Sequence, residues 1–336
     1  MRKWDYLSSL FIESRPHIKS SDTTNVIMSD VLIAMIFLVV LSFLYFGSRA
    51  LLVILVSVLT CFVLETLLIS IRKKSFIVPD ISSIVTGVII GLLMPANVPL
   101  YVPIVASVFS ISIVKQCFGG LGQNIFNPAA GGLAFIAFCW PKELFTYPVP
   151  DIAIKTDMIS TNVCETLKLG GYPNIQIIDM LLGKQPGPMG SVHILVIISC
   201  VIWLIMRRSV YWPSILSFLV SCFCVSFIFP RIHSARVLSV MYEFCSGSLL
   251  FGAVFMITDP VTSPKYNLSK IVYGALIGVL TMIFRYYGGF SQGIYFAILL
   301  GNSISFSLDK VMYKYFNSNN MRFIKTLPKK IKKGAL

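Results

Sequence analysis

The chain has 336 residues, of which 56% are hydrophobic and only 12% charged. Soluble globular domains carry roughly 25% charged residues, so a soluble enzyme is excluded and most of this surface must face lipid. The mean hydropathy of +0.82 agrees with that conclusion. Lys and Arg outnumber Asp and Glu by 28 to 14, a formal net charge of +14. We interpret this excess as basic residues that flank membrane spans, and we expect membrane lipid rather than nucleic acid as the surrounding partner.

The N-terminal segment, residues 1–29, carries four basic residues, and no apolar core directly follows the first charges. That pattern is untypical of a secretory signal peptide. We therefore predict a cytoplasmic N-terminal arm.

The sequence contains ten apolar runs whose lengths can be judged against the roughly 20 residues that one spanning helix needs. Residues 81–114 hold no charge over 34 positions, and prolines divide this stretch into two spans. The predicted spans lie near residues 31–48, 50–71, 83–95, 99–115, a fifth ending near 140, 192–206, 211–229, 237–257, 271–287 and 291–308.

The spans divide the chain into five parts. With the N-terminus inside, 20 of the 28 basic residues fall on the cytoplasmic side and 8 outside, as the positive-inside rule favours. We predict a multi-pass protein of the cell inner (plasma) membrane with both termini cytoplasmic. Its parts are the arm 1–29, a first transmembrane half of five spans 30–140, an outer loop 141–191, a second half of five spans 192–309 and a basic cytoplasmic tail 310–336.

The two halves share a local pattern. Met94 and Met256 are each followed by a proline-containing turn, an apolar helix and a Gly-Gly pair, Gly119-Gly120 and Gly288-Gly289 respectively. The topology places the two Gly-Gly pairs on opposite sides of the membrane, as in an inverted repeat with broken helices. Chance similarity between glycine-rich turns is the alternative. The predicted fold class is an all-α integral membrane protein of about ten transmembrane helices, with an inverted repeat and Gly/Pro-broken re-entrant segments.

The first polar stretch inside the apolar sequence is residues 119–128, which contains Gln123, Asn124 and Asn127. Glycines permit unusual backbone angles and the amides supply donors and acceptors. Irregular backbone at membrane depth is tolerated only beside protein or a water-filled cavity. A re-entrant segment on an ion path and an ordinary interhelical turn are equally consistent with this stretch.

The second stretch, residues 258–264, contains Thr258, Asp259 and Thr262. A carboxylate at the edge of hydrocarbon is costly unless it is paired or hydrated, so Asp259 is a candidate cation or proton site. The alternative is a helix N-cap. Glu243 and Glu65 also lie inside apolar runs; we include Glu243 among the ion-path candidates, although a structural role for either residue remains the alternative.

Signatures of independent catalysis are absent from the sequence. It has no Walker A loop, dinucleotide-binding glycine pattern or nucleophile elbow. Its eight cysteines form no CxxC pair, and its three histidines are far apart, so no metal site is predicted.

With these segments in view, the chain resembles the D-type subunit of the Rnf electron-transport complex, a family related to the B-type subunit of the Na+-translocating NADH:quinone oxidoreductase. The resemblance covers most of the chain. Its specific segments are Arg15–Ser20 with Ile27, Met28 and Asp30, Phe118–Asn124 with Asn127–Ala129, Thr258–Pro264, and Gly288-Gly289 with Asn302.

This resemblance implies a membrane subunit of a six-subunit translocase that includes iron–sulfur and flavin subunits. Such complexes couple electron transfer between ferredoxin and NAD+ to Na+ or H+ translocation. The subunit is not expected to be catalytic by itself. The implied cofactor is FMN, with riboflavin as a second candidate. A stand-alone cation or solute transporter on the same repeat, or a structural subunit without cofactor, are the alternatives.

The family attaches FMN to a threonine of the outer loop through a phosphoester, and this chain departs from that pattern. The matching stretch is residues 157–164, in which Val163 stands at the acceptor position. Valine has no hydroxyl group, so it cannot form the ester. Either the attachment is lost, or Thr161 or Thr166 substitutes for the acceptor; we favour loss.

Overall fold

The computed structural model describes residues 24–73, 79–150, 162–232 and 235–326, and the regular elements in these ranges are helices. Residues 1–23 of the predicted N-terminal arm and the middle of the outer loop, with Thr161, lie outside the described residues, whereas residues 24–29 belong to the first helix. The helices are α2 (Thr24–Phe46), α3 (Ser48–Lys73), α4 (Ile81–Leu92), α5 (Tyr101–Phe109), the π-helix η1 (Ser110–Gln116), α6 (Pro128–Cys139), α7 (Pro141–Phe145), α8 (Val163–Lys168), α9 (Ile177–Leu181), α10 (Ile194–Met206), α11 (Trp212–Ile228), α12 (Arg236–Cys245), α13 (Leu249–Phe255), α14 (Asn267–Tyr287) and α15 (Ile294–Thr326).

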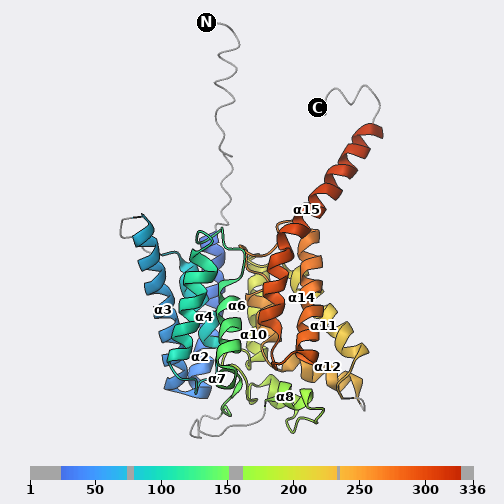
Figure 1. Ribbon diagram of the computed structural model, residues 1–336. Helices are drawn as coiled ribbons and strands as arrows, with labels where there is room; N and C mark the ends of the chain where they lie inside the picture. The colour runs from blue at the N-terminus through green and yellow to red at the C-terminus, as the bar shows by residue number, and fades with distance from the viewer. Residues whose placement is uncertain (1–23, 74–78, 151–161, 233–234, 327–336) are drawn as a thin grey trace.

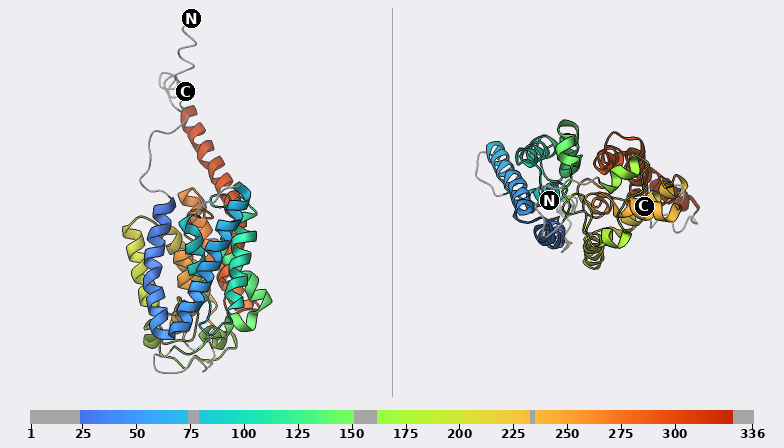
Figure 2. Two further views of the ribbon diagram at one scale, coloured as in Figure 1. Left: turned by 90° about the vertical axis from the view of Figure 1, so that its left-hand side faces the viewer. Right: turned by 90° about the horizontal axis from the view of Figure 1, so that it is seen from below.

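The long helices stand side by side in two groups. Helices α2 to α6 form one group and α10 to α15 the other, and the view from below shows the two groups next to each other (Figure 2). The beginning of α2 and the end of α15 lie at one end of the bundle, whereas the short helices α7 and α8 lie at the other (Figure 1). We call these the upper and the lower end.

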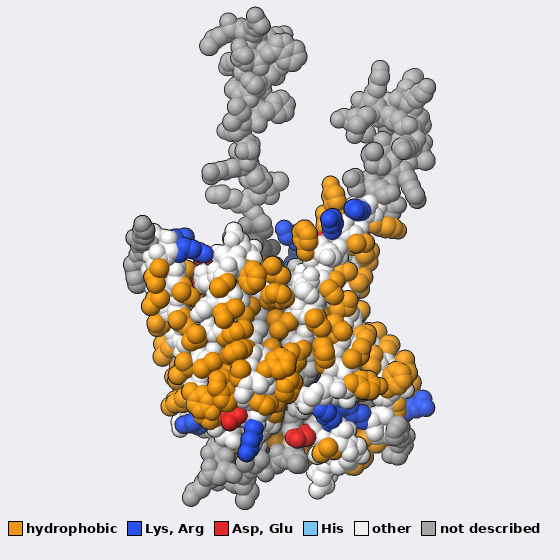
Figure 3. All heavy atoms as spheres, in the orientation of Figure 1, with side chains coloured by type: hydrophobic (Ala, Val, Ile, Leu, Met, Phe, Trp, Pro, Cys, Tyr) orange, Lys and Arg blue, Asp and Glu red, His pale blue; other side chains and the backbone are white. Residues whose placement is uncertain are grey.

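Several of the helices have the length and composition of membrane spans. Among the described residues, α2, α3 and α14 are each long and apolar enough to cross a bilayer, and α12 with α13 would cross as a bent pair. Five shorter apolar helices accompany them: α4, Tyr101–Gln116, α6, α10 and α11. The space-filling view shows an apolar belt around the middle of the visible face, with charged side chains towards both ends (Figure 3). The protein is therefore an all-helical, multi-pass membrane protein.

Glycines let neighbouring helices approach closely. A Cβ atom at Gly274 would lie 2.4 Å from the carbonyl oxygen of Ser214, and one at Gly278 would lie 2.6 Å from that of Phe218. These pairs advance in the same direction along both helices, so α11 and α14 run parallel and begin at the same end. Small residues at such contacts are typical of helix packing in membranes, where burial of apolar surface gives no driving force.

Two predicted spans differ from the structure in detail. The eighth, expected as one helix over 237–257, is bent by 55° between α12 and α13. Gly247 lies at this break with φ +65, a backbone conformation that glycine adopts without strain. The tenth was expected to end near 308, but α15 continues to Thr326 because its polar continuation contains good helix formers such as Lys310 and Lys314.

The backbone groups freed at the broken helices are bonded within the protein. At the end of α4, the carbonyl oxygen of Leu92 accepts from the N–H of Gly190 at 2.7 Å, and that of Met94 accepts from the N–H of Met189 at 3.2 Å. Beyond α13, the carbonyl oxygen of Met256 accepts from Asn127 Nδ2 at 3.3 Å. Irregular backbone can therefore lie at membrane depth here.

Candidate ion site and flavin region

The structure brings the two polar stretches together at one small cavity. Asn124 and Asn127 from the first stretch and Thr258 and Asp259 from the second all line it. The volume of the cavity that the centre of a water molecule can reach is about 40 Å³. One water needs roughly 10–15 Å³ on this measure, so the space suits an ion with few waters rather than an organic ligand.

Two oxygen-bearing groups make this cavity suitable for a cation. The Asp259 carboxylate accepts hydrogen bonds from Thr262 Oγ1 at 2.8 Å and from the Val261 N–H at 3.4 Å. Asn124 is 6% exposed, and its Oδ1 has no hydrogen-bond partner among the described residues. Buried polar atoms normally have a partner, and hard cations prefer oxygen ligands. An unpartnered amide oxygen and a carboxylate beside one cavity therefore indicate room for a cation or a protonated water.

A buried ion pair borders the same cavity. Lys115 Nζ lies 2.7 Å from Glu65 Oε1 and 2.6 Å from Ser82 Oγ, and both charged side chains are only 1% exposed. Lys115 and Ser82 line the cavity themselves. The pair is internally neutral, so Asp259 supplies the unbalanced negative charge of the lining.

Lys115 belongs to η1, and π-helical turns occur frequently at functional sites. Sequence reasoning noted Glu65 but missed Lys115 as its partner. The available signal was a lone lysine and a lone glutamate in separate apolar runs, since charges inside a membrane usually pair with each other.

Amide groups tie the two halves together beside the cavity. Asn127 is the N-cap of α6 and accepts from the N–H of Ala130 at 3.1 Å. Its own N–H donates to Asn302 Oδ1 of α15 at 3.0 Å. Asn302 Nδ2 in turn donates to the Tyr273 hydroxyl at 2.7 Å. This network fixes the entry of α6 against α14 and α15, and so holds the first polar stretch in place.

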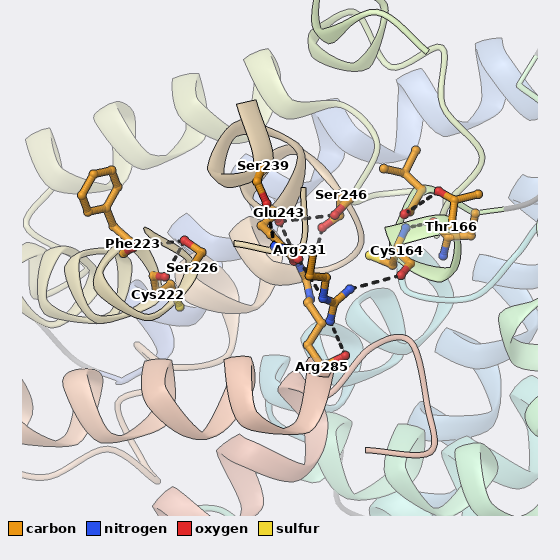
Figure 4. A network of polar contacts seen from close by, with 12 residues as sticks. Cys164, Thr166, Cys222, Phe223, Ser226, Arg231, Ser239, Glu243, Ser246 and Arg285 are labelled. Atoms are coloured by element: carbon orange, nitrogen blue, oxygen red, sulfur yellow. Dashed lines mark hydrogen bonds and ion pairs between the residues drawn. The ribbon is translucent and has the colours of Figure 1, made fainter. Parts of the chain in front are cut away.

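Glu243 lies elsewhere, in a group with Arg231 and Arg285 that we call the arginine cluster (Figure 4). Helix α12, which carries Glu243, lies towards the lower end (Figure 1). Its carboxylate is 3.2 Å from Arg231 Nε and 3.0 Å from Arg285 Nη1. Arg285 also donates to the carbonyl oxygens of Glu243 and Ser246, at 2.6 and 3.1 Å. The cluster thus satisfies backbone groups at the bend between α12 and α13. Asp259 precedes α14 and Arg285 ends it, about 30 Å further along a helix of this length.

The remaining predicted residues are separated from the cavity. Gln123 is exposed and does not line it, whereas Thr262 is buried and reaches it through its bond to Asp259. Thr166 is half-buried on α8, and its hydroxyl donates to the carbonyl oxygen of Val163 at 2.9 Å.

Position 163 does not fit a flavin ester. The Val163 side chain is 1% exposed and packs in an apolar cluster with Leu167, Met180 and Ile194. It therefore lacks both the hydroxyl group and the exposure that attachment at this position requires.

Fold and cavity define the class of the protein: a multi-pass α-helical membrane protein with a buried candidate ion site between its two halves. The family model described as the NQR2, RnfD, RnfE family matches residues 11–316, and the chain belongs to this family. The resemblance found in the sequence motifs is thereby confirmed.

Named relatives match over almost their whole length. The D-type subunit of the Na(+)-translocating ferredoxin:NAD(+) oxidoreductase complex of Acetobacterium woodii is 32% identical over 301 residues, covering 88% of this chain and 91% of the relative. Its counterpart in the proton-translocating ferredoxin:NAD(+) oxidoreductase complex of Clostridium ljungdahlii is 28% identical over 308 residues, covering 89% and 93%. The counterpart in the ion-translocating oxidoreductase complex of Colwellia psychrerythraea is 29% identical over 330 residues, covering 88% and 94%.

Proposed function

We propose that this chain is the D-type membrane subunit of a complex that couples electron transfer between ferredoxin and NAD+ to the translocation of Na+ or H+. The observation that carries the proposal is the cavity at Asp259, found in a chain whose relatives are named for ion translocation. The subunit supplies a membrane path for the ion. Iron–sulfur and flavin subunits of a six-subunit assembly supply the redox chemistry.

The proposed topology has ten spans and an inverted repeat. In it, α4, Tyr101–Gln116, α6, α10, α11 and α15 each cross the membrane together with the longer spans. The upper end is the cytoplasmic face of the inner membrane, because the basic residues gather on that side in the ten-span arrangement. The outer loop and the arginine cluster then lie at the outer face.

The cavity acts through its charge balance. Glu65 neutralises Lys115, so Asp259 is left as the group that attracts a cation or accepts a proton. Thr262 and the Val261 N–H hold the carboxylate, and the Asn124 oxygen offers a further ligand atom. A cation that leaves water is stabilised here by oxygen atoms that are already in position.

We further propose that the covalent FMN of the family is lost at position 163, which leaves non-covalent FMN or riboflavin as the candidate cofactors. The buried valine supports this proposal. The test is in-gel fluorescence of the denatured, purified chain. We expect no flavin fluorescence on the band. A fluorescent band that disappears in Thr161→Ala or Thr166→Ala would overturn the loss.

Membership in the complex is tested by gentle purification of the tagged chain from its native membrane. We expect iron–sulfur and flavin subunits to co-purify and the isolated assembly to reduce NAD+ with reduced ferredoxin. A chain that purifies alone from membranes with intact ferredoxin:NAD+ activity, and that transports cations by itself in vesicles, would establish the stand-alone transporter instead.

A further inference from the structure

A second pocket, of about 430 Å³, opens at the upper end beside the ion cavity. It lies between the α10–α11 connection, the start of α2 and the loop before α14, and shares Thr258 and Pro260 with the ion cavity. Its lining contains the basic residues Arg208, Lys265 and Lys270. An entrance for cations would be expected to carry acidic groups, so this basic lining needs another explanation.

The three cations have no ion-pair partner among the described residues. Two carboxylates lie nearby, but both are engaged. Asp30 binds the Arg207 side chain at 3.1 Å and the Ser209 hydroxyl. Asp309 accepts from the backbone N–H groups of Lys265 and Tyr266, at 2.8 and 3.3 Å. Lys270 lies over the Tyr211 ring and within the electrostatic influence of Asp309, but among the described residues none of the three cations forms an ion pair, so the pocket presents a net positive surface.

Two helix N-termini strengthen this positive character. Because α11 and α14 run parallel, both begin at the pocket, where Ser214 of α11 and Lys270 of α14 belong to its lining. Neither helix has a side-chain cap at its N-terminus. Pro213 of α11 has no N–H and the Ser214 N–H donates to the carbonyl oxygen of Tyr211, so the two helix dipoles, rather than free amide groups of α11, favour an anion here.

The backbone conformation of Arg208 also supports an anion-binding site. Its φ is 58, the one positive value for a non-glycine residue in the described part of the chain. The N–H groups of Arg208 and Ser209 bond to Ile205 and Leu204, a helix end at which glycine normally stands. An arginine in this strained position suggests a function, because the strained backbone brings a cationic side chain to the pocket.

We propose that this pocket binds the phosphodiester headgroup of an anionic phospholipid. Arg208, Lys265 and Lys270 hold the phosphate, and the positive ends of the α11 and α14 helix dipoles add to the attraction. Basic pockets between membrane helices at the cytoplasmic side are suited to such headgroups. The neighbouring Trp212 is 52% exposed, and Ile27, Val210 and Tyr211 give the pocket an apolar wall for the lipid's glycerol region. The proposal does not depend on the redox function of the complex.

The test measures binding of dioleoyl-phosphatidylglycerol to the delipidated full chain in a non-ionic detergent, by native mass spectrometry and by thermal unfolding. Wild type should retain this lipid and melt at a higher temperature in its presence, with no comparable effect of phosphatidylcholine. The triple variant Arg208→Gln/Lys265→Gln/Lys270→Gln should bind about a hundredfold more weakly, because each basic residue near an anionic headgroup contributes about a factor of five.

Two further variants separate headgroup binding from net charge and from misfolding. Lys142→Gln/Lys184→Gln/Arg236→Gln removes the same charge from exposed positions outside this pocket and should keep wild-type binding. Arg208→Lys/Lys265→Arg/Lys270→Arg keeps the charge and should keep most of the affinity. Equal lipid binding by wild type and the first triple variant would overturn the proposal. A thermal shift obtained with millimolar inorganic phosphate and not with lipid would overturn the assignment to a lipid.

Discussion

Lys115→Met removes the ammonium group that neutralises Glu65 inside the bundle. The two side chains are 2.7 Å apart and each is 1% exposed, so the Glu65 carboxylate would stay buried with the Gln116 amide, at 3.2 Å, as its remaining hydrogen-bond donor among the described residues. Removing one partner of a buried ion pair costs about 3–5 kcal/mol, because the remaining charge is uncompensated. For a chain of this size that free energy corresponds to a melting temperature lower by about 10 °C.

The assay is thermal unfolding of the purified chain in detergent, with Lys142→Met as the exposed control. The double variant Lys115→Met/Glu65→Leu should recover most of the loss, because replacing both buried charges by apolar groups is often close to neutral. The reasoning is refuted if Lys115→Met melts like the control, or if the double variant is no more stable than the single one.

Three further predictions concern stability and use the same assay. Gly274→Ala should destabilise by about 1–3 kcal/mol because its methyl group would meet the Ser214 backbone at 2.4 Å, whereas Gly289→Ala, which meets open space, should be nearly neutral. Equal effects of the two substitutions would contradict the close approach of α11 and α14 at Gly274. Asn302→Ala should cost about 1–3 kcal/mol because it leaves the buried N–H of Asn127 without its partner, and Ser303→Ala is its exposed neighbour control. Glu243→Gln should destabilise the protein by several kcal/mol, because two arginines lose their counter-charge, and the exposed Glu165→Gln is its control. Unchanged stability of Glu243→Gln with impaired transport would instead place Glu243 on the ion path.

The sequence predicted the membrane architecture because hydrocarbon imposes simple requirements on composition. Uncharged runs indicated where helices lie, and prolines marked the break between α4 and α5. The bend at Gly247 was not predicted. A Ser-Gly-Ser sequence inside an apolar run was the available signal, but the satisfaction of the freed carbonyl groups by Arg285 depends on a helix roughly 40 residues away in the chain.

The sequence predicted which residues belong to the candidate site, but not which residues they contact. Amides near 124 and the carboxylate of Asp259 are unusual in an apolar context, so each stretch was recognisable by itself. Their meeting at one cavity, the pairing of Lys115 with Glu65 and the Asn127–Asn302 bond are long-range contacts. Such contacts follow from the packing of the two halves, which local patterns do not contain. For the same reason Glu243 and Asp259, both carboxylates next to apolar helices, could not be told apart before the fold was known.

The most direct test of the account is ion transport by Asp259→Asn in inverted membrane vesicles. The measured quantity is the initial rate of cation uptake driven by reduced ferredoxin and NAD+, divided by the rate of NAD+ reduction, at equal amounts of assembled complex. We predict that this ratio falls at least tenfold in Asp259→Asn and is unchanged in the control Asp179→Asn, whose carboxylate is 41% exposed beside Lys184. A wild-type ratio in Asp259→Asn would contradict the assignment of the cavity to the ion path.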